Sequence, residues 1–316
     1  MKLIFAGTPD FGKEVLMALI NSNQKVEAVF TQPDRASGRG KKIKVSPVKQ
    51  LALEKGIDFY QPKNLEEQDS IDVIKLISPD LIVVAAYGLI IPKKVLDIPK
   101  YGALNIHASL LPRWRGASPI EHSILSGDKL SGITLMQMTG GLDKGPIYET
   151  YDCKIEPKEN SGSLEDKLIK ICHAKLSSFL GSFENKKKRT LDQDDSLATY
   201  ANKITDSYQK IRWSKETALQ LDRRIRSLSP KLGAFTFLGE RRIKVFEAEP
   251  VTSTKKLSPG ELSVVSKNEL IVGCHNGTSI SILKTQVEGK NLTGIKEFIS
   301  GYRNVLNKEQ KFKSRI

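Results

Sequence analysis

The sequence predicts an α/β fold: a Rossmann-like, mostly parallel sheet with helices on both faces, followed by a small OB-like β-barrel domain. Three observations lead to this prediction. Apolar, β-branched runs alternate with helical patterns in the first half of the chain, short strands with closely spaced turns fill the second half, and a charged polar stretch lies between them. With 316 residues, the chain is also long enough for two well-packed domains.

Four short, apolar and β-branched runs in the first half of the chain are typical of buried strands. They lie at residues 2–7, 25–31, 80–88 and 102–108. Stretches with helical periodicity separate the earlier runs, at residues 11–22 and 46–56. This alternation of strand and helix indicates a parallel sheet with helices on both faces.

Two more strands are expected at residues 131–138 and 145–155, and an amphipathic helix follows at residues 163–183. The pattern then gives way to charged and small polar residues, which are typical of a linker. We therefore expect three parts: a first domain over residues 1–186, an interdomain linker over residues 187–206, and a second domain over residues 207–316.

Short strands with closely spaced turn signals dominate the second domain. Residues 233–251 and 260–289 carry these signals. Closely spaced antiparallel strands in a segment of this size suit a small OB-like barrel, a fold that often binds nucleic acids.

The composition is that of a globular protein, with 39% hydrophobic and 27% charged residues. No run reaches about eighteen apolar residues, the length that a membrane-spanning helix needs. The N-terminus has no signal-peptide pattern, so we expect a cytoplasmic protein without a membrane partner. We also expect a monomer. Cys153, Cys172 and Cys274 lie far apart and form no CxxC pair, so neither a disulfide frame nor a zinc site is expected.

Positive charge is concentrated in two parts of the chain. The whole chain has 50 basic and 36 acidic residues, a formal net charge of +14. Residues 187–316 hold 25 basic and 14 acidic side chains, and residues 35–49 hold six basic and no acidic ones. Charge focused in this way favours a polyanionic partner, most simply a nucleic acid, although a basic composition alone is weak support.

Two nucleotide-binding motifs are only partly matched. Gly7, Gly12 and Lys13 nearly complete the phosphate-binding pattern GxxxxGK[ST], but Glu14 replaces the hydroxyl that would hold magnesium. The same turn lacks the GxGxxG pattern of dinucleotide-binding folds. Neither an ATPase nor a dehydrogenase is therefore expected.

Polar side chains interrupt the apolar strand expected at residues 102–108. Asn105 and His107 are two residues apart, so both side chains leave the strand on the same face. An asparagine amide can donate to a developing oxyanion, and a histidine can exchange a proton near neutral pH. Asp143 lies farther along, in a glycine-rich turn, where it could orient the histidine or take up a proton through water. The three residues together predict a donor, imidazole and carboxylate site.

Each of these residues also has a purely structural interpretation. Asn105 can satisfy its own loop, His107 can be a packed core residue, and Asp143 can simply form the turn between glycines. Residue type and spacing alone leave both interpretations open.

Five segments resemble the folate-dependent formyltransferases, most closely the members that act on tRNA. Residues 104–120, LNIHASLLPRWRGASPI, and residues 139–147, TGGLDKGPI, carry the resemblance most clearly. Residues 5–12, 31–49 and 83–96 are similar to the same family. The likeness covers nearly the whole chain, but in the second domain it depends only on the position of that domain in the chain, its size and its charge.

The resemblance implies both a site and a reaction. Asn105, His107 and Asp143 correspond to the catalytic trio of the family, and the 10-formyltetrahydrofolate site is bordered by Ser109, Leu110, Leu111 and Pro112. The implied reaction transfers the formyl group from this folate to the α-amino group of methionine on initiator methionyl-tRNA, for translation initiation. It requires no metal.

The resemblance also implies where the tRNA is held. In the family, the basic loop engages the acceptor stem, and here that loop contains Arg39, Lys41 and Lys42. The basic second domain is expected to add phosphate contacts, for which the candidates are Arg223, Arg224 and Arg226. For both groups of residues, an ordinary solvated surface is the alternative.

Two other functions remain open from the sequence. The same trio serves formyltransferases that act on a ribonucleotide amine or an amino sugar, and a nucleic-acid-binding protein could retain an inactive enzyme-like domain. The basic loop and the basic second domain favour a tRNA acceptor, because a small amine would not need them.

Overall fold

The computed structural model describes residues 1–37, 42–187, 189–253 and 255–314, which form two compact units. The first unit comprises Met1–Pro119, Leu130–Lys154 and Glu165–Asn202, and the second comprises Ile120–Lys129, Ile155–Leu164 and Lys203–Ile316. Each unit has its own buried apolar cluster. The domain limits expected at residues 186 and 206 stay a prediction.

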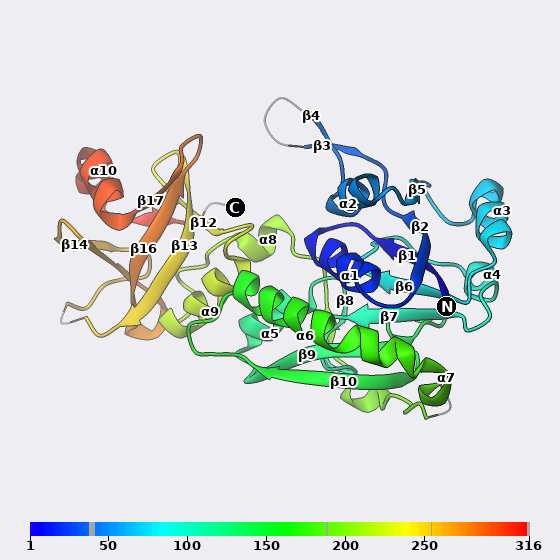
Figure 1. The fold of residues 1–316 in the computed structure, drawn as a ribbon. Coiled ribbons are helices and arrows are strands. Elements are labelled where there is room, and N and C mark those ends of the chain that lie inside the picture. The colour runs from blue at the N-terminus through cyan, green and yellow to red at the C-terminus, as the bar shows by residue number, and fades with distance from the viewer. Residues whose placement is uncertain (38–41, 188, 254, 315–316) are drawn as a thin grey trace. The chain divides into compact units, whose positions relative to one another are not determined.

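The first unit is built on a seven-stranded sheet with the order β10-β9-β7-β6-β1-β2-β5 (Figure 1). Its strands are β1 (Lys2–Gly7), β2 (Lys25–Phe30), β5 (Asp58–Tyr60), β6 (Leu81–Ala85), β7 (Ala103–His107), β9 (Leu130–Gln137) and β10 (Ile147–Lys154). From β5 to β7 the neighbouring strands are parallel, whereas β9 and β10 are antiparallel to their neighbours. The expected mostly parallel sheet is confirmed.

Helices pack on both faces of this sheet. They are α1 (Asp10–Ile20), α2 (Pro47–Lys55), α3 (Gln68–Ile77), α4 (Lys93–Leu96), and the long α6 (Ser161–Gly181) with the short α7 (Phe183–Lys186). Ile74 of α3 and Val95 of α4 join Ile4 of β1 in one apolar cluster. Phe5 points to the opposite face because side chains alternate along a strand. The buried side chains of α1 lie outside that cluster, and α1 contacts β1 and β6.

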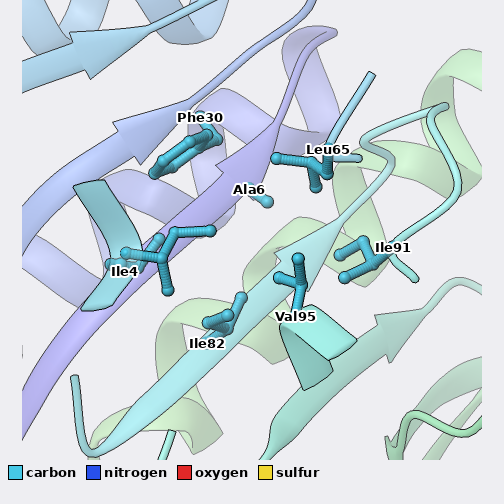
Figure 2. Close-up of a pocket in the computed structure, with 8 residues that line it drawn as sticks. Ile4, Ala6, Phe30, Leu65, Ile82, Ile91 and Val95 are labelled. Carbon is cyan, nitrogen blue, oxygen red and sulfur yellow. The ribbon is translucent and has the colours of Figure 1, made fainter. Parts of the chain in front are cut away.

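A small apolar void lies between the sheet and helices α3 and α4 (Figure 2). It has a volume of about 10 Å³ and is lined by Ile4, Ala6, Phe30, Leu65, Ile74, Ile82, Ile91 and Val95. A buried water needs two or more polar partners, and these eight side chains offer none. The void is therefore a packing feature of the core and not a ligand site.

The second unit contains an antiparallel sheet with the order β14-β15-β16-β13-β12-β18, and β17 pairs with β16. These strands are β12 (Ala234–Leu238), β13 (Arg241–Val251), β14 (Leu262–Ser266), β15 (Glu269–Gly273), β16 (Ser279–Val287), β17 (Leu292–Gly294) and β18 (Phe312–Lys313). They form an antiparallel half-barrel, which confirms the expected type of second domain.

Two helices of the second unit were not expected from the sequence. The core of the unit includes Leu221 and Ile225 of α9 (Ala218–Leu228) and Phe298 and Ile299 of α10 (Ile295–Glu309). The apolar spacing in α9 is helical, but Arg223, Arg224 and Arg226 lower its hydrophobicity and obscure the pattern. A capping box of Thr217 and Gln220 marks the start of α9. The candidate tRNA-binding residues Arg223, Arg224 and Arg226 therefore lie on a helix.

Within the described ranges, no helix is long and apolar enough to cross a membrane.

Enlarging the apolar void should destabilise the first unit. Ile82 is 2% exposed and lines the void, whereas Ile90 is 87% exposed. We expect Ile82→Ala to lower the free energy of unfolding by about 2–5 kcal/mol, because the lost burial is added to a larger cavity. Ile90→Ala, which removes the same atoms from a surface side chain, should change it by less than about 0.5 kcal/mol. Chemical denaturation followed by circular dichroism measures both, and equal losses would contradict this view of the core.

Candidate active site

Strand β7 carries two polar side chains on one face of the sheet. Asn105 and His107 are buried, with 8% and 6% of their surface exposed. Ala103, two residues earlier, packs in the apolar cluster under α3 and α4, so all three residues lie on that face. Val95 and Leu96 of the short helix α4 are buried in that cluster, which includes Ala103 but neither Asn105 nor His107.

Asp143 lies against both of these side chains. The turn between β9 and β10 begins beside Ala103, whose carbonyl accepts a hydrogen bond of 2.8 Å from the Met138 amide. The Asn105 side-chain amide donates to Asp143 Oδ1 at 3.2 Å, and His107 Nδ1 lies 3.7 Å from Asp143 Oδ2. The structure therefore brings together the three residues that the sequence singled out.

The backbone of Trp114 fixes the orientation of the imidazole. His107 Nε2 lies 2.9 Å from the carbonyl oxygen of Trp114. A carbonyl oxygen can only accept, so Nε2 carries the hydrogen of this bond. Nδ1 is then the nitrogen that can exchange a proton, and it faces Asp143.

Asp143 is held in a conformation that few residues adopt. Its φ of 48° lies in the left-handed region, which is unfavourable for residues with a Cβ atom. The Gly116 amide donates to Asp143 Oδ2 at 2.8 Å, and the Gln193 side-chain amide donates to the backbone oxygen of Asp143 at 2.8 Å. These bonds keep the carboxylate beside the two side chains of β7.

The segment Ser109 to Pro112, expected to border a folate, forms a compact loop after β7. The Ser109 hydroxyl donates to the Arg113 carbonyl at 2.6 Å. Thr134 of β9 donates to the Ser109 carbonyl at 2.6 Å and accepts from the Leu111 amide at 3.0 Å. Ser109 and Leu111 are buried, while Leu110 and Pro112 are partly exposed. The Ser109 hydroxyl hydrogen is used within the loop, and its oxygen can still accept a hydrogen bond.

The basic loop lies partly outside what the structure describes. Arg39 and Lys41 are outside the described residues, and Lys42 begins β4 (Lys42–Lys44), which pairs with β3 (Arg35–Ser37). The position of these residues at a tRNA site stays a prediction.

The base of this hairpin is well anchored. Lys49 Nζ lies 2.6 Å from Asp34 Oδ2, and this hydrogen bond lowers the pKa of the Asp34 carboxyl. Gln61 also donates to Asp34, at 2.8 Å. These contacts hold the start of the hairpin against α2.

Two of the three arginines proposed for tRNA contact form internal ion pairs. Arg224 lies 2.6 Å from Glu216 Oε1, and Arg226 lies 2.7 Å from Asp222 Oδ2; all four side chains are at most 16% exposed. Arg223 Nη1 donates to the Ser126 carbonyl at 3.4 Å. Arg224 and Arg226 therefore compensate buried carboxylates, and phosphate contact by any of the three stays a prediction.

Three residues beside the site, Arg115, Gln193 and Asp195, were given no role from the sequence. Arg115 has a side chain with 0% exposure, and it donates to Gln193 at 2.8 Å and to Asp195 at 2.7 Å. The hydrogen bond from Arg115 holds the pKa of the Asp195 carboxyl below its ordinary value. Gln193 and Asp195 lie in the segment expected to be a linker, so hydrophobic periodicity could not connect them with the site.

The arrangement is suited to acyl transfer. An amide donor and an imidazole with one nitrogen available lie 3.2 Å and 3.7 Å from one carboxylate, so the three groups can stabilise an oxyanion and exchange a proton. In the described part of the chain, no group of three or more His, Cys, Asp or Glu side chains could hold a metal ion.

The chain matches known proteins along almost all of its length. Residues 1–180 match the family model described as formyl transferase, and residues 203–303 match the model of its C-terminal domain. The methionyl-tRNA formyltransferase of Legionella pneumophila (strain Paris) is 40% identical over 97% of this chain and 97% of its own. That of Marinobacter nauticus is 40% identical over 97% of this chain and 98% of its own.

A solved structure shares the fold. HypX from Aquifex aeolicus, in complex with tetrahydrofolic acid, matches with a TM-score of 0.65 and 15% identity. The match covers 96% of this chain but only 47% of HypX, so the chain spans about half the length of that protein. At this identity the likeness shows the fold alone.

Two glycines of the Asp143 turn should respond differently to substitution. A Cβ atom on Gly145 would lie 1.7 Å from the Gln137 carbonyl oxygen, whereas one on Gly140 would have no neighbour within 4 Å. We expect Gly145→Ala to lower the free energy of unfolding by about 1–3 kcal/mol, because the backbone must move to remove the clash. Gly140→Ala should be close to neutral. Thermal unfolding measures both variants, and equal stability of the two would contradict the close approach at Gly145.

Proposed function

Because the chain belongs to the formyl transferase family and matches methionyl-tRNA formyltransferases along 97% of its length, we infer that it formylates methionyl-tRNA for translation initiation. The observation that carries this conclusion is the 40% identity to such enzymes over that length. It favours a tRNA acceptor over the ribonucleotide and amino-sugar acceptors that the sequence left open. The remaining details of substrate, site and mechanism are proposals.

The proposed formyl donor is 10-formyltetrahydrofolate. Membership of the formyl transferase family supports this proposal, and HypX, which shares the fold, was solved with tetrahydrofolic acid. The proposed border of the donor site is the loop that begins at Ser109 and ends at Pro112, directly after the strand that carries His107. Loops that follow the strands of an open α/β sheet are the usual ligand sites of such folds.

Asn105 is proposed to stabilise the oxyanion. When the amine attacks the formyl carbon, the carbonyl oxygen becomes negatively charged. The Asn105 amide has two hydrogens; one is donated to Asp143, and the second is the proposed donor to the oxyanion. A donor held in place before the reaction needs no reorganisation when charge develops.

His107 and Asp143 are proposed to handle the protons. With Nε2 bonded to Trp114, a protonated His107 presents Nδ1–H as a second donor to the oxyanion. Asp143 keeps this nitrogen oriented and accepts, through water, the proton that the attacking α-amino group loses. The tetrahedral intermediate then breaks its bond to N10 of the folate, and N10 takes up a proton.

The proposed acceptor is initiator methionyl-tRNA, held by positive charge. Residues 187–316 have 25 basic and 14 acidic side chains, which suits a polyanion. Because Arg224 and Arg226 are held in ion pairs, the proposed phosphate contacts are assigned to exposed cations of the second unit, such as Arg241. The basic hairpin beyond Asp34 is the proposed second contact.

Formyl transfer from 10-formyltetrahydrofolate to charged tRNA tests the proposed function directly. We expect labelled formyl to appear on initiator methionyl-tRNA, with at least about a hundredfold lower kcat/KM for charged elongator methionine tRNA. Such a ratio corresponds to about 2.7 kcal/mol of discrimination. Free methionine and small amines serve as controls, and transfer to them at rates equal to those with tRNA would contradict a tRNA acceptor.

Removing the amide of Asn105 should impair catalysis far more than donor binding. An oxyanion-hole donor is worth about 3–4 kcal/mol, so Asn105→Ala should lower kcat by about two to three orders of magnitude. The Kd of the folate should change little. Calorimetry and single-turnover kinetics separate the two effects, and equal losses of folate affinity and rate would reduce Asn105 to a residue that only positions the donor.

Salt dependence distinguishes phosphate contacts from internal ion pairs. If exposed Arg241 contacts a phosphate, Arg241→Gln should lower the slope of log affinity against log salt by about 1. Arg224→Gln should mainly lower thermal stability, because Glu216 would lose its ion pair. Filter-binding titrations with initiator methionyl-tRNA give the slopes. An unchanged slope for Arg241→Gln would show that Arg241 makes no contact with a tRNA phosphate.

A further inference from the structure

A segment that follows the last helix of the first unit is bonded along its length to the candidate active site. This segment, residues 191–201, is called the strap here. Leu191 forms a bridge with Ile147 of β10, and β11 (Tyr200–Ala201) pairs with β8 (Arg115–Gly116). The strap therefore touches both the strand after the Asp143 turn and the loop after β7.

One side chain of the strap holds the Asp143 turn. The Gln193 amide nitrogen donates to the backbone oxygens of Asp143 and Gly145, both at 2.8 Å. Its two hydrogens thus connect the two carbonyl groups on either side of Lys144. Because Asp143 has a left-handed φ of 48°, the turn depends on such bonds to keep this conformation.

Arg115 determines which way the Gln193 amide points. Arg115 Nε and Nη2 donate to Gln193 Oε1 at 3.1 and 2.8 Å. A guanidinium group only donates and the turn carbonyls only accept, so the amide oxygen must face Arg115 and the amide nitrogen must face the turn. The remaining nitrogen, Nη1, donates to Asp195 at 2.7 Å, which compensates the buried charge of Arg115.

The backbone on either side of Arg115 holds the other parts of the site. The Trp114 carbonyl is bonded to His107, and the Gly116 amide is bonded to the Asp143 carboxylate. The Arg115 amide itself donates to the Thr199 carbonyl of the strap at 2.9 Å. Arg115 thus connects the strap with the residues that orient both the imidazole and the carboxylate.

We propose that Gln193 is a positioning residue that sets the Asp143 carboxylate relative to His107, with Arg115 holding Gln193 in place. The proposal rests on the proposed function only where it predicts a rate. Without the two bonds from Gln193, the carboxylate can move away from Nδ1, and displacements of about 1 Å commonly reduce a rate by two orders of magnitude.

The substitution Gln193→Glu separates the hydrogen bonds that Gln193 accepts from those that it donates. A glutamate still accepts from Arg115, but it cannot donate to the Asp143 and Gly145 carbonyls and repels them. The second variant is Gln193→Met, which removes both the accepted and the donated hydrogen bonds while keeping a similar side-chain volume. Gln286→Glu is the matched control, because the Gln286 amide also donates to a backbone carbonyl, that of Lys290, in the second unit.

Single-turnover formyl transfer is measured for each variant. We expect the single-turnover rate constant at saturating folate to fall at least about tenfold for Gln193→Glu and Gln193→Met, with the half-saturating folate concentration within about threefold of the parent. With the charged tRNA at saturating concentration, Gln286→Glu should keep the parental rate. In an Asp143→Asn background, Gln193→Glu should reduce the rate by less than about twofold, because residues that act as a unit are non-additive. An equal loss in both backgrounds, or parental rates for Gln193→Glu, would overturn the proposal.

Amide exchange at Gly116 gives a readout that needs no substrate. Its hydrogen bond runs to the Asp143 carboxylate, whereas the Arg115 amide is bonded to Thr199. We expect exchange at Gly116 to be at least about tenfold faster in Gln193→Glu, with exchange at Arg115 unchanged. Unchanged exchange at Gly116 would overturn the proposal. Absence of formyl transfer by the parent protein would instead refute the proposed function and leave this exchange test intact.

Discussion

The site depends on one carboxylate. Asp143 accepts hydrogen bonds from the Asn105 side chain and from the Gly116 backbone, and it lies 3.7 Å from the imidazole of His107. It thereby joins strand β7 and the loop after it to the turn between β9 and β10, which lies farther along the chain. Because each of these contacts requires a particular position of the carboxylate, the backbone around Asp143 is the most constrained part of the site.

The position of the carboxylate is constrained by a sheet that is parallel in one part and antiparallel in another. The parallel strands place Asn105 and His107 on one face, and the antiparallel strands β9 and β10 return a glycine-rich turn to the same face. Gly145 allows the turn to pass close to the Gln137 carbonyl, where no other residue would fit. A buried guanidinium, Arg115, then connects this turn with the strap. The chemistry of the site needs only three side chains, but their geometry requires contacts from several other segments.

The sequence was sufficient to predict the sheet and the shared face of Asn105 and His107 because both leave local signals, whereas Asp143 was grouped with them through the family resemblance. Buried strands are short apolar runs, and the spacing of Asn105 and His107 places them on one face whatever the rest of the fold does. The strap was expected to be a linker because its contacts with Arg115 and Asp143 are made by polar side chains over long sequence separations. Helix α9 was missed because its arginines obscure the apolar spacing, and the ion pairs of Arg224 and Arg226 could not be seen without it.

The orientation of His107 is the feature on which the proposed chemistry depends most directly. If the Trp114 carbonyl accepts from Nε2, then Nδ1 is the nitrogen that exchanges a proton beside Asp143. Protein labelled with ¹⁵N-histidine has four imidazoles, and a His107→Asn variant identifies the signals of His107. Two-bond ¹H–¹⁵N spectra of the neutral form should show a protonated Nε2 and an unprotonated Nδ1. A neutral His107 protonated at Nδ1 would contradict the proposed site.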